Sequence, residues 1–165
     1  MFHVVLVEPE IPQNAGNIAR TCAATGCVLH LVKPLGFEIS DKYLKRAGLD
    51  YWSLVEVRVH ENWEELLSEL KGARMHFFTT KARKAYTEEA YKDGDALVFG
   101  KETKGLPEEL LLQHQEECVR IPMLGETRSL NLSNSVAVAV YEGLRQSNFE
   151  GFNLQGELHR LKWNV

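Results

Sequence analysis

Short apolar runs alternate along this chain with segments whose apolar residues recur at helical spacing. Nearly all of the runs lack strict alternation of apolar and polar residues, which is typical of strands buried on both faces. The expected strands cover residues 2–7, 28–32, 54–59, 75–79, 96–99 and 118–121. This pattern predicts a mainly parallel sheet that helices cover on both sides.

Helical segments separate the expected strands. They cover residues 14–25, 41–47, 62–71, 107–114 and 130–147, with a weak candidate at 88–91. Asn62 followed by Glu65 fits a capping box, and Pro107 suits the first turn of a helix. We therefore expect an α/β, doubly wound fold, with residues 1–165 as one domain of ordinary size. The tail 148–165 has no clear pattern, and one interpretation is that it packs on the surface.

Composition and charge narrow the possible functions. The chain has 19 basic and 23 acidic residues and a net charge of −4, which excludes a diffuse electrostatic attraction to nucleic acid and requires a local patch for any RNA contact. Its three cysteines, Cys22, Cys27 and Cys118, lack metal-ligand spacing and are expected to be reduced and buried. With no signal-peptide pattern and no apolar run near about 18 residues, we expect a soluble, cytoplasmic protein without a membrane partner.

Familiar nucleotide and metal motifs are absent from the sequence. The first strand runs into EPEIPQNAGN and not into a G-x-G-x-x-G motif, and the segment 100–105 lacks the residues that complete a phosphate loop. An ordinary Rossmann methyltransferase and an NTPase are therefore disfavoured. The six histidines are dispersed along the sequence without a paired helical motif, so no metal is predicted.

Three polar motifs follow expected strands. The first, NAGNIAR at 14–20, offers Asn14 or Asn17 as a helix cap and Arg20 as a phosphate ligand, unless it is only a capped helix with a solvated arginine. The second, GKETKGLP at 100–107, places Gly100 where a flat ligand can lie against the backbone. Its Glu102 is either functional or bonded only to loop amides.

The third motif, IPMLGETRSLNLSNSVAVAVYE at 121–142, combines apolar and small polar side chains at the start of a helix. The apolar residues are Ile121, Met123, Leu124 and Leu130, and the polar residues are Ser129, Asn131, Ser133 and Asn134. Such a mixture suits a purine ring with a polar tail, although a loop followed by a core helix would also explain the apolar residues.

Basic and aromatic residues gather after several expected strands. The basic residues are Lys42, Lys45, Arg46, Lys81, Arg83, Lys84, Lys101, Lys104 and Arg128, and the aromatic residues are Tyr43, Tyr51, Trp52 and Tyr86. These side chains are candidates for contacts with phosphates and unpaired bases. Solvated charges and aromatic packing under a loop are the alternative interpretation.

Together and in this order, the three motifs resemble the SPOUT superfamily of RNA methyltransferases, and specifically its SpoU-type 2′-O-methyltransferases. Within that group, the segments VLVEPEIPQNAGNIARTCAATG, KPLGF, DKYLKRAGLDYW and LNLSNSVAVAVYE are similar to small tRNA (cytidine/uridine-2′-O)-methyltransferases. The resemblance implies methyl transfer from S-adenosylmethionine, without a metal, to the ribose of the wobble nucleotide, position 34, in the anticodon stem-loop of leucine tRNAs. It also implies a deep carboxy-terminal trefoil knot, which is a rare topology.

The resemblance also assigns roles to residues. The matching cofactor-binding positions are Phe78, Gly100, Ile121 and Ser129, and we add Leu124 and Leu130 as apolar neighbours. The matching catalytic positions are Arg20, Asn14, Glu102, Ser129 and Asn131. Because a guanidinium keeps its proton in proteins, we interpret Arg20 as a clamp that binds phosphate and stabilises the developing oxyanion.

The helix 130–147 carries apolar residues on more than one face, as expected if it covers the sheet on one side and meets a second subunit on another. The resemblance implies a homodimer, whereas burial within a monomer would give the same pattern. Two other functions stay open. One is a SPOUT methyltransferase acting on another RNA site, and the other is a catalytically inactive, knotted RNA-binding protein.

Overall fold

A single parallel sheet organises the chain in the computed structural model, which describes residues 1–40 and 52–164. Its strands are β1 (His3–Val7), β2 (Val28–Val32), β3 (Val57–His60), β4 (Met75–Phe78), β5 (Ala96–Phe99) and β6 (Cys118–Val119). The spatial order is β3-β2-β1-β5-β4-β6, and every pairing is parallel. The predicted parallel α/β sheet is confirmed for the described residues.

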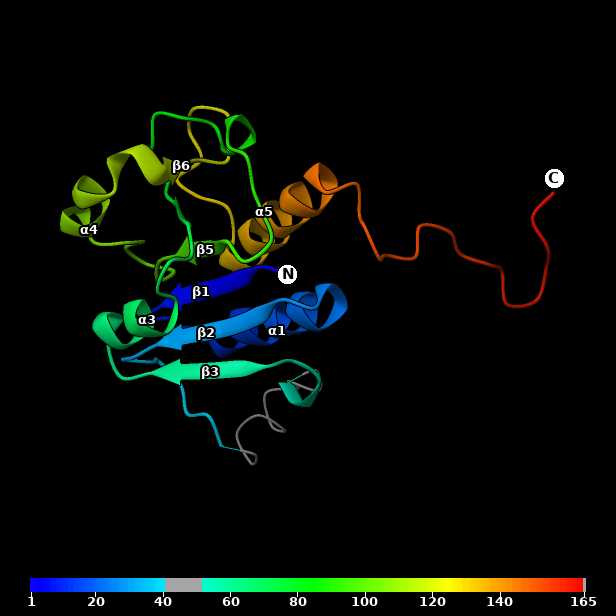
Figure 1. The fold of residues 1–165 in the computed structure, drawn as a ribbon, viewed down its shortest axis with the longest axis horizontal. Helices are drawn as coiled ribbons and strands as arrows, with labels where there is room; N and C mark the ends of the chain where they lie inside the picture. Colours follow the sequence, from blue (N-terminus) through cyan, green and yellow to red (C-terminus); the bar gives the residue numbers. More distant parts are fainter. Residues whose placement is uncertain (41–51, 165) are drawn as a thin grey trace.

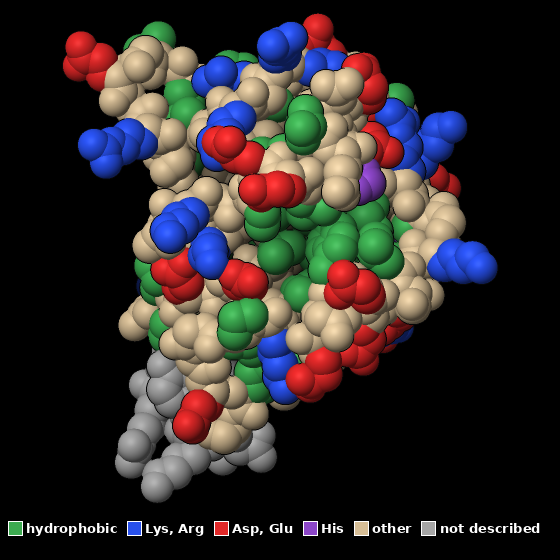
Figure 2. Space-filling model, turned by 90° about the vertical axis from the view of Figure 1, so that its left-hand side faces the viewer, with side chains coloured by type: hydrophobic (Ala, Val, Ile, Leu, Met, Phe, Trp, Pro, Cys, Tyr) green, Lys and Arg blue, Asp and Glu red, His purple; other side chains and the backbone are tan. Residues whose placement is uncertain are grey.

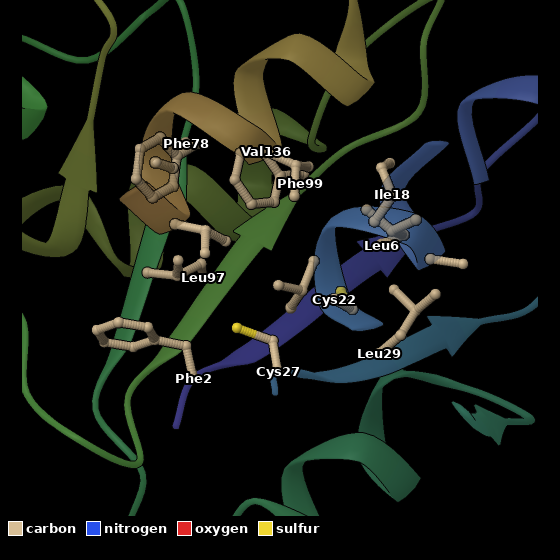
Figure 3. Close-up of a cluster of buried hydrophobic side chains, with 14 of the residues drawn as sticks. Phe2, Leu6, Ile18, Cys22, Cys27, Leu29, Phe78, Leu97, Phe99 and Val136 are labelled. Carbon is tan, nitrogen blue, oxygen red and sulfur yellow. The ribbon is translucent and has the colours of Figure 1, made fainter. Parts of the chain in front are cut away.

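Helices cover both faces of the sheet (Figure 1). They are α1 (Pro12–Thr25), α3 (Trp63–Glu69), α4 (Glu108–Gln113) and α5 (Leu132–Gln146), with short 3₁₀ turns at Trp52–Leu54, Tyr86–Glu88 and Gln115–Glu117. One buried cluster joins α1 and α5 to the sheet through Leu6, Ile18 and Val136 (Figure 3). The other cluster includes Leu66 of α3 and Leu111 of α4.

This division of the core follows from the alternation of side chains along each strand. In β1, Val4 and Leu6 belong to the α1 and α5 side, while Val5 and Val7 belong to the α3 and α4 side. The central strands are therefore apolar at most positions on both faces, which explains the apolar runs in the sequence; the exceptions are His3, His30 and His76.

The chain changes direction across the sheet between β1 and β5. From β1 it continues outward to β2 and β3, whereas β5 borders β1 on the other side, next to β4 and β6. In open parallel sheets, ligands bind outside the carboxyl ends of the strands at such a switch point. The loops that follow β1 and β5 are thus placed where a ligand site is expected.

Several predicted boundaries differ from the structure. Leu54 lies in a 3₁₀ turn and is largely exposed, so β3 starts only at Val57. The weak helix at 88–91 is wrong, because the only helical turn there is Tyr86–Glu88, where Tyr86 N–H donates to Arg120 O across the loops. The predicted helix at 41–47 lies outside the described residues.

The starts of α3 and α4 can be compared with the predicted helix caps. Asn62 caps α3, since its Oδ1 accepts a hydrogen bond from Glu65 N at 2.9 Å, but Glu65 accepts from Glu61 N and so does not complete the capping box. Pro107 precedes the first turn of α4 and does not lie within it.

Other expectations concern the cysteines, the tail and membrane spans. All three cysteines are free and buried, as predicted, and burial raises the pKa of the Cys22 thiol. The predicted packing of the tail on the surface holds for Phe149 and Phe152, which contact the core, and is wrong beyond them, where the chain runs away from the body and Leu154 and Leu161 are exposed (Figure 1). Among the described residues, the helices are all too short or too polar to cross a membrane.

Candidate active site

A cavity of about 410 Å³ lies at the carboxyl ends of β4 and β5 and beside the start of α5. Four segments line it. They contribute Ile11 and Asn14, residues 78–81, residues 99–105, and Ile121, Met123, residues 128–132 and Ser135. Each of the three sequence motifs contributes lining residues, so the loops that follow separate strands meet at one place.

Glu102 joins the second motif to the first. Its carboxylate accepts hydrogen bonds from Glu10 N at 2.8 Å, Ile11 N at 3.0 Å and Asn14 Nδ2 at 3.3 Å. The N-cap residue of α1, Ile11, has no side chain that can cap the helix. The Glu102 carboxylate therefore bonds the backbone at this helix start and places a negative charge near its amino terminus, where the helix dipole favours one.

Asn14 and Asn131 continue the same hydrogen-bonded chain into the third motif. Asn131 Nδ2 donates to Asn14 Oδ1 at 3.0 Å, and Asn131 Oδ1 accepts from the backbone N–H groups of Ser133 and Asn134. Asn131 is thus the N-cap of α5. The chain Glu102–Asn14–Asn131 ties together the starts of α1 and α5 and the loop after β5.

The loop after β5 depends on a close backbone approach at Gly100. A Cβ atom built there would lie 2.1 Å from the carbonyl carbon of Gly105 and 2.2 Å from Leu106 N. Gly105 itself has a φ of +68°, in the left-handed region, and its N–H donates to Lys101 O at 2.9 Å. These two glycines let the loop turn tightly against the end of β5, beside the cavity.

The three motifs that meet at the cavity also occur together in a known protein family. The model of the SpoU rRNA Methylase family matches residues 1–141, which include all three motifs. The chain belongs to the SpoU methylase family. Among curated relatives, the tRNA (cytidine(34)-2′-O)-methyltransferase of Methylovorus glucosotrophus is 55% identical over 152 residues, covering 92% of this chain and 99% of the relative.

Two solved structures of similar proteins have the same fold. One described as giving structural insights into the 2-OH methylation of C/U34 on tRNA is 49% identical, with a TM-score of 0.84 over 91% of this chain and 98% of the other. An AdoMet-bound rRNA methyltransferase from Sinorhizobium meliloti is 26% identical, with a TM-score of 0.76 over 87% of this chain and 56% of that longer chain.

Most of the residues assigned from the SpoU resemblance lie around the cavity. Its lining includes the predicted cofactor-binding residues Phe78, Gly100, Ile121, Ser129 and Leu130. It also includes the predicted catalytic residues Asn14, Glu102, Ser129 and Asn131. Two predicted residues lie elsewhere: Leu124 is 92% exposed and outside the lining, and Arg20 is an exposed residue of α1 that does not line the cavity.

Thr79 and Thr80 also line the cavity, and sequence reasoning did not single them out. Their position in the sequence could have indicated a role in the site, because they directly follow a fully buried strand whose carboxyl end lies where the three motifs meet. Thr79 N–H donates to Val119 O at 2.9 Å, which extends the pairing between β4 and β6 to the cavity.

Basic side chains border the cavity, but acidic side chains lie among them, so they do not form a continuous positive patch. Lys81, Lys101, Lys104 and Arg128 are among its lining residues. Lys81 pairs with Glu108 at 3.0 Å, and Lys101 pairs with Glu8 at 2.6 Å, which raises the pKa of the Lys101 ammonium. Figure 2, which faces the carboxyl ends of the strands, shows basic and acidic side chains interspersed around an apolar area.

Arg83 and Lys84 line a second hollow beside α4. Trp52 and Tyr86 pack partly buried against the core, as the alternative interpretation of the aromatic residues proposed. The other predicted RNA-contact residues, Lys42, Tyr43, Lys45, Arg46 and Tyr51, lie outside the described residues.

Proposed function

We propose that this SpoU protein transfers a methyl group from S-adenosylmethionine to the ribose 2′-hydroxyl of the wobble nucleotide, cytidine or modified uridine, in leucine tRNAs. The observation that carries the proposal is the chain Glu102–Asn14–Asn131, which gathers all three motifs around one cavity. The names of the similar proteins support the reaction and the position in tRNA. As an enzyme acting on tRNA, it is proposed to work in the cytoplasm.

The cavity fits the proposed cofactor in size and chemistry. Its volume of about 410 Å³ lies within the range of roughly 300–1,000 Å³ that is usual for small-molecule sites. Phe78, Ile121 and Met123 offer apolar surface for a purine, and the polar side chains at the start of α5 suit the sugar and the amino-acid end. When bound, S-adenosylmethionine supplies an electrophilic methyl carbon on a sulfonium; the proposal requires no metal.

The described residues divide the remaining work. Asn14 and Asn131 fix each other's orientation through their mutual hydrogen bond, and Glu102 holds Asn14 in place. Arg20 is exposed on α1, about one turn after Gly16, and an exposed side chain there suits a contact with bound RNA. We assign it to the phosphate beside the target ribose and to the developing oxyanion, as a bidentate donor that keeps its own proton.

Arg20→Lys tests this assignment. Lysine keeps the positive charge and loses the fork of donors, so kcat should fall at least tenfold while tRNA affinity changes little. Near-normal turnover with unchanged RNA binding would refute the bidentate role.

The proposal includes a homodimer that packs through α5. Val136, Val140 and Leu144 of α5 are buried in this chain, whereas Val138 is 37% and Tyr141 is 47% exposed. Two apolar faces on one helix suit a sheet on one side and a second subunit on the other. Analytical ultracentrifugation should give a dimer for the natural chain and a monomer for Tyr141→Glu; a monomeric natural chain would refute the dimer.

A deep carboxy-terminal trefoil knot is also part of the proposal, supported by the family resemblance. The chain between β6 and α5 lines the same cavity as the loop after β5, so the two segments that a knot would thread lie together. A crystal structure traced through residues 119–132 tests the threading, and an unthreaded path would refute it.

The reaction itself is tested with labelled S-adenosylmethionine and total tRNA, followed by nucleoside mapping. Label in a 2′-O-methyl group at position 34 of leucine tRNAs is the expected result. Label on a base, or on another RNA only, would favour a different SpoU substrate. Binding of tRNA and cofactor without transfer would favour the inactive, RNA-binding alternative.

A further inference from the structure

Three histidines that are far apart in the sequence form a line across the first three strands. His3 lies on β1, His30 on β2 and His60 on β3, and the strand register with the alternation of side chains puts all three on the face that α3 covers. His3 Nδ1 lies 2.9 Å from His30 Nε2, and His30 Nδ1 lies 2.9 Å from His60 Nε2. Each ring is therefore held by its neighbour.

The line ends at a nitrogen without a partner. The His60 side chain is 1% exposed, and its Nδ1 makes no hydrogen bond to any described residue. The atom faces Glu69 Oε2 at 3.6 Å, which is too long for a hydrogen bond. An unsatisfied buried polar atom is unfavourable, so its position beside a carboxylate requires an explanation.

We propose that His30, His60 and Glu69 bind a divalent transition-metal ion of the zinc class. One ligand atom from each of the three residues lies within 4.8 Å of the others. Zinc bonds of about 2.0–2.1 Å in a tetrahedron place ligand atoms about 3.4 Å apart, so ligand atoms that lie up to 4.8 Å apart must draw together by as much as about 1.4 Å. Glu69, the last residue of α3 and 34% exposed, is the ligand best able to move.

The surrounding contacts suit this ligand set. His60 offers the unpartnered Nδ1, and His30 offers Nδ1 if it exchanges its hydrogen bond to His60 for a coordinate bond. His3 then keeps the other nitrogen of His30 in place, as partners behind metal-bound histidines usually do. Two imidazoles and one carboxylate favour zinc, cobalt or nickel over magnesium or calcium.

Arg58 is the main opposing group. Its guanidinium donates to Glu69 Oε1 and to Glu56, so Glu69 Oε2 stays directed at His60 while a positive charge lies nearby. That charge should weaken binding of a cation, and its removal should strengthen it. The site lies on β2, β3 and α3, none of which lines the proposed cofactor cavity, so its expected role is to fasten α3 to the edge of the sheet.

The test is a titration of the untagged, chelator-treated full chain with Zn²⁺ by calorimetry, and with Co²⁺ by visible absorption. We expect one ion per chain, a tetrahedral cobalt spectrum and a higher melting temperature with zinc. Glu69→Gln should raise the Kd at least tenfold and remove the cobalt spectrum. His60→Gln should do the same if it folds, but the surface variant Glu69→Gln is sufficient.

Two control variants separate a metal site from a structural contact. Arg58→Gln breaks the Arg58–Glu69 ion pair without removing a ligand, and because it also removes a nearby positive charge it should lower the zinc Kd. His114→Gln disrupts a His–Glu pair elsewhere in the molecule, with Glu117 at 2.7 Å, and should leave the zinc Kd unchanged. Absence of binding at millimolar zinc, an unchanged Kd in Glu69→Gln, or an equal loss in Glu69→Gln and Arg58→Gln would each overturn the proposal.

Discussion

Replacing Gly100 by alanine should damage the proposed active site through backbone contact alone. The added Cβ would lie 2.1 Å from the Gly105 carbonyl carbon and 2.2 Å from Leu106 N, whereas ordinary contacts of a Cβ begin near 3.4 Å. The loop must therefore move away from β5 by more than about 1 Å. Both neighbouring atoms belong to the backbone, so rotation of a side chain cannot relieve the clash.

The cost should appear in stability and in cofactor binding. Overpacking of this kind typically costs about 1–3 kcal/mol, and roughly 2 kcal/mol would lower the Tm of a chain of this length by about 4–8 °C. Leu106 is buried in the core on the α4 side, so the displaced loop also disturbs packing. Because residues 99–105 line the cavity, we expect affinity for S-adenosylmethionine to fall at least tenfold.

The matched control is Gly125→Ala. Gly125 lies in the loop between β6 and α5, has no left-handed φ, and would place its Cβ with nothing within 4 Å. Differential scanning calorimetry measures the Tm of both variants, and titration with S-adenosylmethionine measures their cofactor Kd. If Gly100→Ala bound the cofactor and melted like the natural chain, the inference from close backbone approach would be refuted.

Three further substitutions test the hydrogen bonds described above. Glu102→Gln removes charge-assisted hydrogen bonds at the start of α1, so it should lower the free energy of unfolding in urea by about 1.5–3 kcal/mol and weaken cofactor binding. An unchanged urea midpoint would count against the capping role of Glu102. Asn131→Ala should cost about 1 kcal/mol as a lost N-cap and also weaken cofactor binding. Asn62→Ala removes the N-cap of α3, so it should lower the free energy of unfolding by a similar amount and leave the cofactor Kd unchanged. An equal loss of cofactor affinity in Asn131→Ala and Asn62→Ala would contradict the placement of the cofactor site beside α5.

Much of the sheet could be predicted because burial on both faces leaves a plain signal in the sequence. The strands 28–32 and 96–99 were predicted to the residue, and every residue in them is buried. The errors fall where the signal is ambiguous. Leu54 is apolar but 69% exposed, and the turn at Tyr86–Glu88 is shaped by a hydrogen bond to Arg120, more than thirty residues later in the chain.

The meeting of the three motifs was predictable because parallel strands bring their following loops to one edge. The pairing of side chains within the site was not. The sequence left open whether Glu102 bonds only loop amides, and it does bond two amides, but they belong to Glu10 and Ile11, which lie over ninety residues earlier. Likewise, Leu124 has the apolarity of a cofactor neighbour, yet its loop holds it in solvent.

The histidines give a second example of contacts that the sequence could not predict. Their dispersal in the sequence predicted no metal site, because spacing along one helix was the criterion. His3, His30 and His60 are 27 and 30 residues apart, which is close to the length of one strand, crossover and return to the next parallel strand. A repeat of this length places equivalent positions side by side, so neighbouring parallel strands can assemble ligands that no local motif reveals.

The two halves of the sheet therefore carry different chemistry and meet at β1. On one side, β2 and β3 carry His30 and His60, which form the histidine line together with His3 of β1. On the other side, β5, β4 and β6 lead to the cavity. Glu102 crosses this boundary, since it reaches from the loop after β5 to the segment that follows β1. The contacts of Glu69 with Arg58 and His60 stay within the first half. A substitution at Glu69 should thus leave the cofactor Kd unaltered, whereas one at Glu102 should change both that Kd and the stability of α1.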